Sequence, residues 1–329
     1  MKLQRLALGA ALMMAACTTQ AAVQHVAPPL LVQTSAFDAG ISVALPEVEA
    51  EELPGLHHVY RLSDNIVSGA EPEGVEAFAS MKTLGIRTVL SVDGKAPDHE
   101  LAAEHGIRYV HVPIRYDGIT DDELVAITKT FRELEGPFYV HCFHGQHRGP
   151  AAAAVGRIVL DGASREQALA EMRQWCGTSS KYEGLYGVAA FGALPNAATT
   201  ATSDFDFSPE HRFDGLRSAM IDMTRSFDTI EDLMLRDWGV NPHHPDASAV
   251  NEAAKLLESF EQSLAFEDTL SRPSEFSQML EDSRATAARL VEHLEARRAG
   301  DPEAGELAAQ QVEALANQCS RCHASYRNN

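Results

Sequence analysis

The chain has 329 residues, 45% hydrophobic and 22% charged, which is an ordinary composition for a globular protein. This length predicts about two domains, with enough apolar residues to form two cores. The formal net charge of −20 argues against nucleic acid or an anionic lipid surface as partner, so any phosphate binding must come from a local arrangement of residues.

Residues 1–22 have the pattern of an export signal, with two basic residues followed by an apolar run over 6–16. The run is too short for an ordinary membrane-spanning helix. Residues 14–17, Met-Ala-Ala-Cys, resemble a bacterial lipobox, in which Cys17 would be lipidated and become the new N-terminus. Plain cleavage near Ala21 is the alternative. Both predict a periplasmic or otherwise exported protein, attached to a membrane only if Cys17 is lipidated.

The next segment, residues 23–54, contains Pro28-Pro29 and an acidic stretch, and we expect a linker there. From residue 55 short apolar runs alternate with helical patterns. We expect strands over 60–63, 65–69, 88–92, 108–114 and 137–140, and helices over 74–84, 99–105, 121–134, 151–160, 164–175 and 182–191. The alternation predicts an α/β domain over 55–195, with ligands bound beyond the carboxyl ends of its strands.

Three aspartates follow the strand expected over 108–114. Thr120 and Glu123 form a predicted capping box, which explains Asp121 and Asp122 as residues of the first helical turn. Asp117 has no such explanation, and we select it as the candidate acid of this loop. The alternative is a solvated aspartate in a turn.

Residues 141–148 read His-Cys-Phe-His-Gly-Gln-His-Arg, between an apolar strand and a helix of small residues. A loop of this kind directs successive backbone N–H groups and a helix N-terminus at one point, which favours an anion. The same positive environment stabilises the thiolate of Cys142, and Arg148 offers a planar set of donors to two phosphate oxygens. The stretch therefore predicts a cysteine nucleophile beneath a bound phosphate, with a covalent intermediate.

With the acid loop upstream, the motif of His-Cys, five residues and Arg resembles the signature of the protein-tyrosine and dual-specificity phosphatase superfamily, over about 55–195. The resemblance implies that Cys142 forms a phosphocysteine, that Arg148 binds phosphate and that Asp117 protonates the leaving group. His141 would support the loop and tune the thiol. The residues implied to bind substrate with Arg148 are His141, Phe143, His144, Gly145, Gln146 and His147.

The chain departs from this family at Gly149, where a serine or threonine is usual. That hydroxyl helps the cysteine leave as a thiolate, so its absence implies slow turnover. The alternative is a catalytically weak module that only binds anions, with the C-terminal half as the functional part.

Residues 196–209 are small and polar, and we expect a second linker. Beyond them apolar residues recur every three or four positions in four stretches, over 213–234, 250–264, 276–294 and 308–326. Prolines 242, 245, 273 and 302 lie near the breaks between them. The pattern predicts an all-α four-helix bundle over 210–329.

The last stretch contains Cys319, Cys322 and His323 in the order Cys-x-x-Cys-His, the attachment pattern of c-type haem. The cysteines would hold haem c through thioether bonds, and His323 would be the proximal ligand of the iron. Such attachment takes place after export, as the N-terminal signal requires. A zinc half-site or a disulfide is the alternative, and neither explains His323.

A four-helix bundle that ends in Cys-x-x-Cys-His-x-x-Tyr-Arg, here through Tyr326 and Arg327, resembles cytochrome c′. In that group the distal side of the iron is empty, which favours small gases, or carries a methionine from the first helix. Met220 is our candidate for that ligand and Met223 the second choice; the alternative is that both fill the core. An axial methionine favours electron transfer to a redox partner.

The whole sequence thus predicts an exported fusion of an α/β phosphatase domain, with a central sheet and flanking helices, to an all-α haem domain. Its expected partners are a phosphorylated substrate, either a phosphoprotein or a small phosphoester, and a redox partner or a small gas. Because a thiolate is sensitive to oxidation, we also expect that the state of the haem controls the phosphatase.

Overall fold

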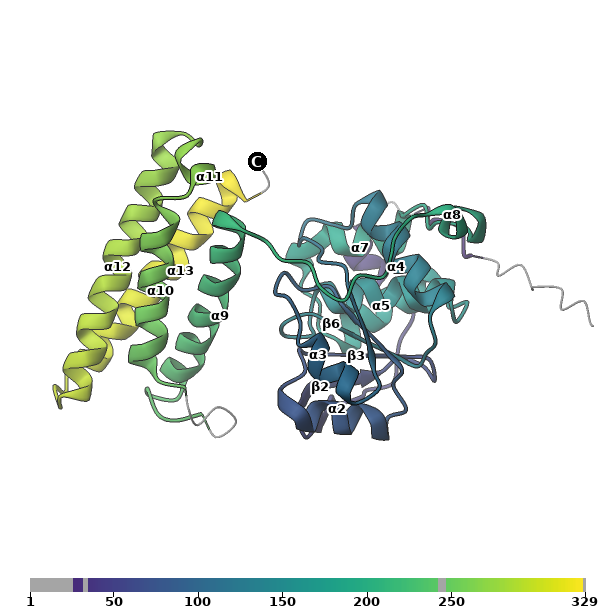
Figure 1. The fold of residues 1–329 in the computed structure, drawn as a ribbon, viewed down its shortest axis with the longest axis horizontal. Coiled ribbons are helices and arrows are strands. Elements are labelled where there is room, and N and C mark those ends of the chain that lie inside the picture. The colour runs from purple at the N-terminus through teal and green to yellow at the C-terminus, as the bar shows by residue number, and fades with distance from the viewer. Residues whose placement is uncertain (1–25, 32–34, 242–246, 328–329) are drawn as a thin grey trace, which may run out of the picture.

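The computed structural model describes residues 26–31, 35–241 and 247–327, which form an α/β unit and a helical unit (Figure 1). The expected export signal and Cys17 lie outside the described residues. No helix in the described ranges is long and apolar enough to cross a membrane.

The α/β unit is built on a mixed six-stranded sheet in the order β1-β2-β3-β6-β4-β5. Its strands are β1 Glu51–Leu53, β2 Leu56–Arg61, β3 Ile66–Gly69, β4 Thr88–Ser91, β5 Arg108–His111 and β6 Phe138–His141. The pairs β3–β6, β6–β4 and β4–β5 are parallel, whereas β1–β2 and β2–β3 are antiparallel. The parallel strands β3, β4 and β6 consequently end at one edge of the sheet, and the segments that follow them meet there.

Helices cover both faces of this sheet, as the sequence predicts. They are α1 Ala36–Ala39, α2 Gly74–Thr83, α3 His99–Glu104, α4 Asp121–Glu133, α5 Arg148–Val159, α6 Arg165–Ala170, α7 Glu183–Phe191 and α8 Ala197–Thr202. Successive strand residues point to opposite faces. Leu90 and Val140 therefore join the core under α4 to α7, and Val89 and Tyr139 join the core under α2 and α3.

The two segments expected as linkers are partly folded onto the α/β unit, which corrects the prediction. Within 23–54, β1 pairs with β2, and the Glu183 carboxylate accepts a hydrogen bond of 3.1 Å from the Phe37 amide. Within 196–209 lies α8, and Phe205 and Phe207 pack against the core. These aromatic residues explain why a stretch rich in small polar residues still folds.

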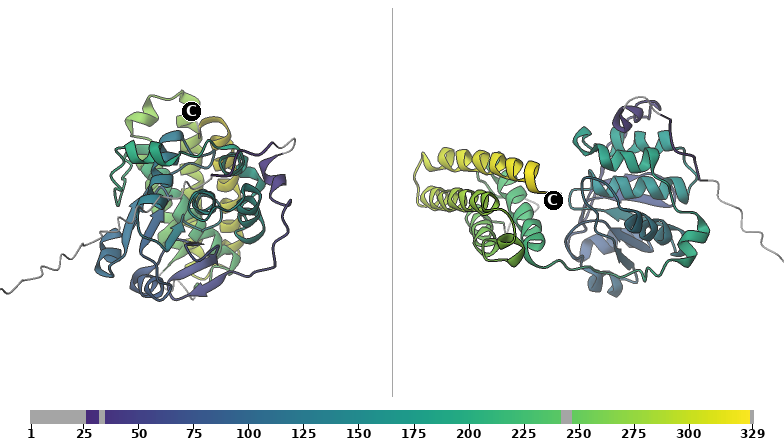
Figure 2. Two further views of the ribbon diagram at one scale, coloured as in Figure 1. Left: turned by 90° about the vertical axis from the view of Figure 1, so that its right-hand side faces the viewer. Right: turned by 90° about the horizontal axis from the view of Figure 1, so that it is seen from above.

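The helical unit contains the four expected helices, α9 Gly215–Leu235, α10 Ala249–Ser263, α12 Ser274–Arg298 and α13 Ala304–Tyr326, with a short α11 Glu267–Leu270. Their apolar faces share one core, an arrangement consistent with the predicted bundle. Figure 1 shows α9 on the side nearest the α/β unit, and the right-hand view of Figure 2 shows the C-terminal end of α13 pointing toward that unit.

Candidate active site

Cys142 follows β6 directly, at the sheet edge where the parallel strands end, and it is 3% exposed. The loop ends at Arg148, where α5 begins without a side-chain cap on its amides. Gly145 has a φ of +70°, and a Cβ there would lie 2.4 Å from the Gly69 carbonyl carbon. Glycine is therefore the residue that this turn accepts. The local structure matches the strand, loop and helix that the sequence predicts.

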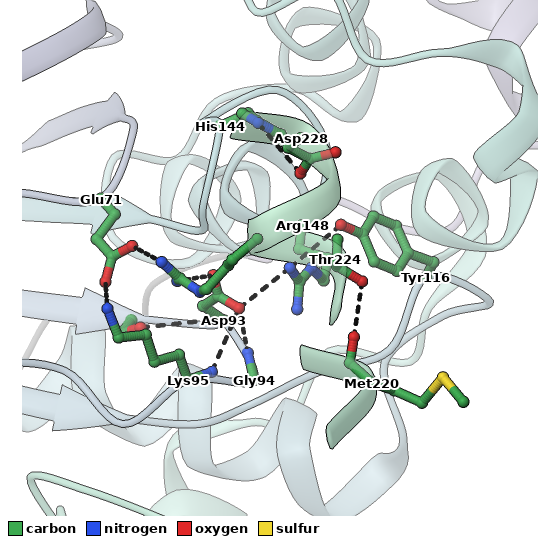
Figure 3. A network of polar contacts seen from close by, with 12 residues as sticks. Glu71, Asp93, Gly94, Lys95, Tyr116, His144, Arg148, Met220, Thr224 and Asp228 are labelled. Atoms are coloured by element: carbon green, nitrogen blue, oxygen red, sulfur yellow. Dashed lines mark hydrogen bonds and ion pairs between the residues drawn. The ribbon is translucent and has the colours of Figure 1, made fainter. Parts of the chain in front are cut away.

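Arg148 is 8% exposed and lies at the first position of α5. Its Nη2 donates to Asp93 Oδ1 and to the Tyr116 hydroxyl, both at 3.2 Å (Figure 3). Within the described part of the chain its Nε is buried without a hydrogen-bond partner. Since an unpaired buried donor is unfavourable, this N–H is available for an anionic oxygen.

Asp93 is a site residue that sequence reasoning missed. It follows β4, the neighbour of β6, and it is 4% exposed. Burial tends to raise its pKa, but Arg148 and Arg225 on two sides lower the pKa below the usual value. Asp93 therefore stays ionised and holds Arg148 in place. An aspartate after a buried strand was the available signal, but the sequence alone does not place β4 beside β6.

Arg225 of α9 extends this network from the helical unit. Its guanidinium pairs with Glu71, and its Nη2 donates to Asp93 Oδ2 at 3.2 Å. Its central carbon also lies 4.1 Å from the ring centre of Phe143. One arginine thus joins the helical unit to both the phosphate loop and the carboxylate that holds Arg148. Sequence reasoning missed this residue because it belongs to the other unit.

His141 lies behind Cys142 and is 1% exposed. Its Nε2 is 2.7 Å from the Tyr109 hydroxyl on β5. Burial lowers the pKa of His141 to about 4, so the imidazole is neutral at pH 7. The contact with Tyr109 links the residue before Cys142 to β5.

The segment between η1 Glu171–Trp175 and α7 also supports the phosphate loop, through hydrogen bonds. The Thr178 hydroxyl donates to the Gln146 carbonyl at 2.6 Å, and the Tyr186 hydroxyl donates to the Thr178 carbonyl at 2.6 Å. The Gln146 carbonyl of the loop therefore has a partner outside the loop, and Tyr186 fixes that partner in turn.

The remaining predicted loop residues point in different directions. Phe143 lines a cavity together with Arg148, whereas His144 faces Asp228 of α9 at 3.5 Å. The His147 ring centre lies 4.5 Å from that of Tyr182, beside the cavity rather than among its lining residues.

Asp117 lies in the loop before α4, and Arg115 Nε is 3.3 Å from its Oδ1. The neighbouring Tyr116 lines the cavity and contacts Arg148, while the Asp117 side chain is not among the lining residues. The capping box of Thr120 and Glu123 is confirmed. The role of Asp117 as acid stays a prediction.

The cavity in front of Arg148 has a volume of about 450 Å³ and lies between the two units. On the helical side it is lined by residues of α9 and α13, including Met220, Cys322 and His323. Arg148 of the phosphate loop and Cys322 and His323 of the predicted haem attachment site therefore line one space, and Cys142 itself is not among the lining residues.

A smaller cavity of about 190 Å³ lies inside the helical unit. It is lined mostly by apolar side chains, with Met220 and Met223 of α9 opposite Cys319, Cys322 and His323 of α13. All four described cysteines are free thiols, and Met220, Cys322 and His323 line both cavities.

The α/β sheet presents a Cys-x5-Arg loop before the N-terminus of α5, as the resemblance in the sequence predicts. Homologues from the dual-specificity phosphatase superfamily cover about a third of the chain. The dual specificity protein phosphatase TpbA of Pseudomonas aeruginosa strain UCBPP-PA14 is 31% identical over 119 residues, 36% of this chain and 54% of TpbA. TpbA of strain PAO1 is 30% identical over 118 residues, 35% and 53% of the two chains. This chain thus spans about half the length of the curated relatives it matches.

Two solved structures are similar to part of the chain. The crystal structure of P. aeruginosa TpbA has 25% sequence identity and a TM-score of 0.36, covering 48% of this chain and 91% of the crystallised chain. The catalytic core of the PP-IP phosphatase SIW14 from S. cerevisiae has 17% identity and a TM-score of 0.34, covering 43% and 86%. No protein-family model matches the chain.

Replacing Arg225 by alanine is expected to destabilise the assembled chain by about 3 kcal/mol, since it leaves the buried Asp93 with one guanidinium instead of two. Denaturant unfolding measures the change. Arg236→Ala is the control, because Arg236 pairs on the same helix with a solvent-accessible Asp232. Equal stability of the Arg225 variant and this control would show that the contact between the units is weak.

Proposed function

We propose that this chain is a phosphomonoester phosphatase of the dual-specificity type that uses Cys142 as its nucleophile. The observation that carries the proposal is the buried pair of Cys142 and Arg148 at the start of α5, with an unpaired Arg148 Nε. The similarity to TpbA supports it. A TpbA variant has been solved with phosphotyrosine, and we extend that substrate class to this chain.

In the proposed reaction the Cys142 thiolate attacks phosphorus and the bond to the leaving oxygen breaks. Arg148 and the loop amides hold the phosphoryl oxygens as charge develops on them. Asp117 gives its proton to the leaving oxygen. Water then attacks the phosphocysteine, Asp117 takes a proton from that water, and phosphate and the Cys142 thiolate are released.

We propose further that the helical unit is a cytochrome c′-like domain that holds haem c. The residues fit this group: Cys319 and Cys322 are free, His323 lies beside them, and an apolar cavity faces them across from Met220. Burial, with Arg327 nearby, lowers the pKa of His323, which favours the neutral form that binds iron. When bound, haem supplies an iron centre that exchanges an electron or binds a small gas. Met220 is the proposed distal ligand.

The proposed localisation follows from haem c, whose attachment takes place after export. Residues 1–22 would direct the chain to the periplasm, and a lipidated Cys17 would hold it at a membrane surface. Both features belong to the proposal and rest on the sequence.

A route for control of the phosphatase by the haem is part of the proposal. Met220 and Arg225 lie on the same helix, α9, and Arg225 contacts the carboxylate that holds Arg148. A displacement of α9 would move Arg225 relative to Asp93, and so would alter the charge that holds Arg148 in position. Rates that are equal with reduced and oxidised haem would contradict this coupling.

The full chain tests the enzymatic part of the proposal through phosphate release from phosphotyrosine and from aryl phosphates. We expect turnover without added metal and competitive inhibition by inorganic phosphate. The assay is run on chain produced with c-type haem maturation, so that both sites are complete. Absence of release from every phosphomonoester offered would favour the anion-binding module.

Replacement of Cys319 and Cys322 by alanine is expected to remove the covalent haem, because both thioether bonds are lost. The wild-type chain from a host that matures c-type cytochromes should keep its haem absorption after extraction with acidified acetone, and the double variant should lose it. Cys176→Ala is the control, since Cys176 lies in the α/β core. Colourless wild-type protein from such a host would contradict the haem proposal.

A further inference from the structure

Arginines are concentrated in the cavity between the two units, although the whole chain has a formal net charge of −20. Three arginines of the helical unit line this cavity and take no part in the contact between Arg225 and Asp93. They are Arg217 on α9, Arg272 before α12 and Arg327 after α13. They line the same space as Arg148 of the phosphate loop.

Each of these three guanidiniums lies over an aromatic ring, and Arg272 Nη1 also donates to the Tyr326 carbonyl at 3.4 Å. Arg217 lies 3.4 Å from the ring centre of Phe213, Arg272 lies 4.9 Å from that of Phe276, and Arg327 lies 4.6 Å from that of Tyr116. None of the three has an acidic side chain within 4.0 Å in the described part of the chain. A stacked guanidinium keeps its in-plane N–H groups available to an anion.

The carboxylates at the cavity wall already have other partners. Asp93 is paired with Arg148 and Arg225, and Asp268 accepts a hydrogen bond of 3.0 Å from the Leu216 amide. Partial burial is the main cause that lowers the pKa of Arg217; Glu123 opposes this effect, and Arg115 and Arg148 add to it. An anion in the cavity would be attracted by these guanidiniums.

Arg327 is close to the phosphate site itself. Its guanidinium carbon and that of Arg148 lie 4.6 Å and 4.4 Å from the ring centre of the same residue, Tyr116. The two guanidinium carbons are therefore no further apart than the sum of these two distances. A ligand with one phosphate on Arg148 has Arg327 within that distance for a second anionic group. Two apolar residues, Leu216 and Ile221, also line this cavity.

We propose that Arg217, Arg272 and Arg327 form a subsite for a second anionic group, so that the preferred substrate is a small phosphomonoester that also carries a phosphate or a carboxylate. This inference rests on the proposed phosphatase function and assigns a substrate class to that site. The helical unit then selects the substrate, because it supplies all three arginines. It also covers part of the phosphate loop through Phe143 and His144, which favours a small ligand over a folded phosphoprotein.

The test is calorimetric binding of inorganic phosphate and of pyrophosphate to the haem-loaded Cys142→Ser chain, in which turnover cannot interfere. We expect pyrophosphate to bind at least about tenfold more tightly than phosphate, and each of Arg217→Gln, Arg272→Gln and Arg327→Gln to reduce that ratio about threefold. Arg289→Gln is the matched control, since Arg289 is exposed on α12 and does not line the cavity.

A ratio near one in the unsubstituted chain, or a ratio that the three substitutions leave unchanged, overturns the inference. If the substitutions shift the reduction potential of the haem and leave the ratio unchanged, the arginines hold the haem carboxylates and the inference is again overturned. Binding of pyrophosphate by a chain that hydrolyses no phosphomonoester would support the subsite while refuting the proposed function.

Discussion

Replacement of Cys142 by serine is expected to reduce phosphate release from an aryl phosphate by about 10⁴-fold or more. A serine hydroxyl needs a general base to attack phosphorus, whereas a cysteine thiolate attacks without one. His141, the nearest histidine in sequence, is buried with its Nε2 2.7 Å from the Tyr109 hydroxyl. Because serine has nearly the shape of cysteine, the loop should still bind phosphate. Loss of turnover with retained phosphate affinity is the expected result.

The control for this substitution is Cys176→Ala. Cys176 is fully buried, and burial raises the pKa of its thiol, so it is protonated and has no chemical role. Activity should remain within about threefold of wild type. A Cys142→Ser chain that still hydrolyses the aryl phosphate would show that another residue is the nucleophile. An inactive Cys176→Ala chain would show that the assay reports loss of folding and not loss of the nucleophile.

Gly149 has a steric explanation that the sequence alone did not offer. A Cβ at this position would lie 3.1 Å from the Cys142 amide nitrogen and 3.2 Å from the His141 carbonyl carbon, closer than an ordinary contact. The first turn of α5 therefore packs tightly against the nucleophile's backbone. A serine or threonine at this position would require that backbone to shift. Glycine therefore permits the close approach of α5 to the loop, and the usual hydroxyl is absent.

Local sequence predicted the parts of the site that depend on neighbours in the chain. The order of strand, loop and helix around Cys142, and the capping box at Thr120, need only residues within a few positions of one another. The four long helices likewise follow from a repeat of apolar residues. The expected segment over 276–294, for example, lies inside α12.

The rest of the site depends on contacts that no local pattern contains. Asp93 and Arg148 are 55 residues apart, and Arg225 reaches Asp93 from 132 residues further along the chain. The first contact requires β4 to lie beside β6, and the second requires α9 to face the sheet edge. The net charge of −20 pointed away from a polyanionic ligand, whereas the fold collects arginines into one cavity. The net charge of the whole chain does not determine the electrostatic potential inside one cavity.

Asp117→Asn is expected to lower turnover of phenyl phosphate about 10²-fold, while turnover of nitrophenyl phosphate falls less than about tenfold. The difference arises because a nitrophenolate leaves readily as an anion, whereas a phenolate needs a proton in the transition state. In the structure the Asp117 carboxylate pairs with Arg115, and its neighbour Tyr116 contacts Arg148. The loop of Asp117 thus contacts the phosphate site through Tyr116, and an acid role requires the Asp117 carboxyl group to turn away from Arg115 toward the cavity.

Asp122→Asn separates this role from a general loss of negative charge, because Asp122 lies in the first turn of α4 and is exposed. It should leave both rates within about twofold of wild type. Asp93→Asn gives a different signature: with Arg148 less firmly held, KM should rise for both substrates, and the dependence on the leaving group should be unchanged. If Asp93→Asn and not Asp117→Asn makes the rate sensitive to the leaving group, then Asp93 is the acid. In that case its ion pairs with Arg148 and Arg225 must open during each turnover, because an ionised carboxylate has no proton to give.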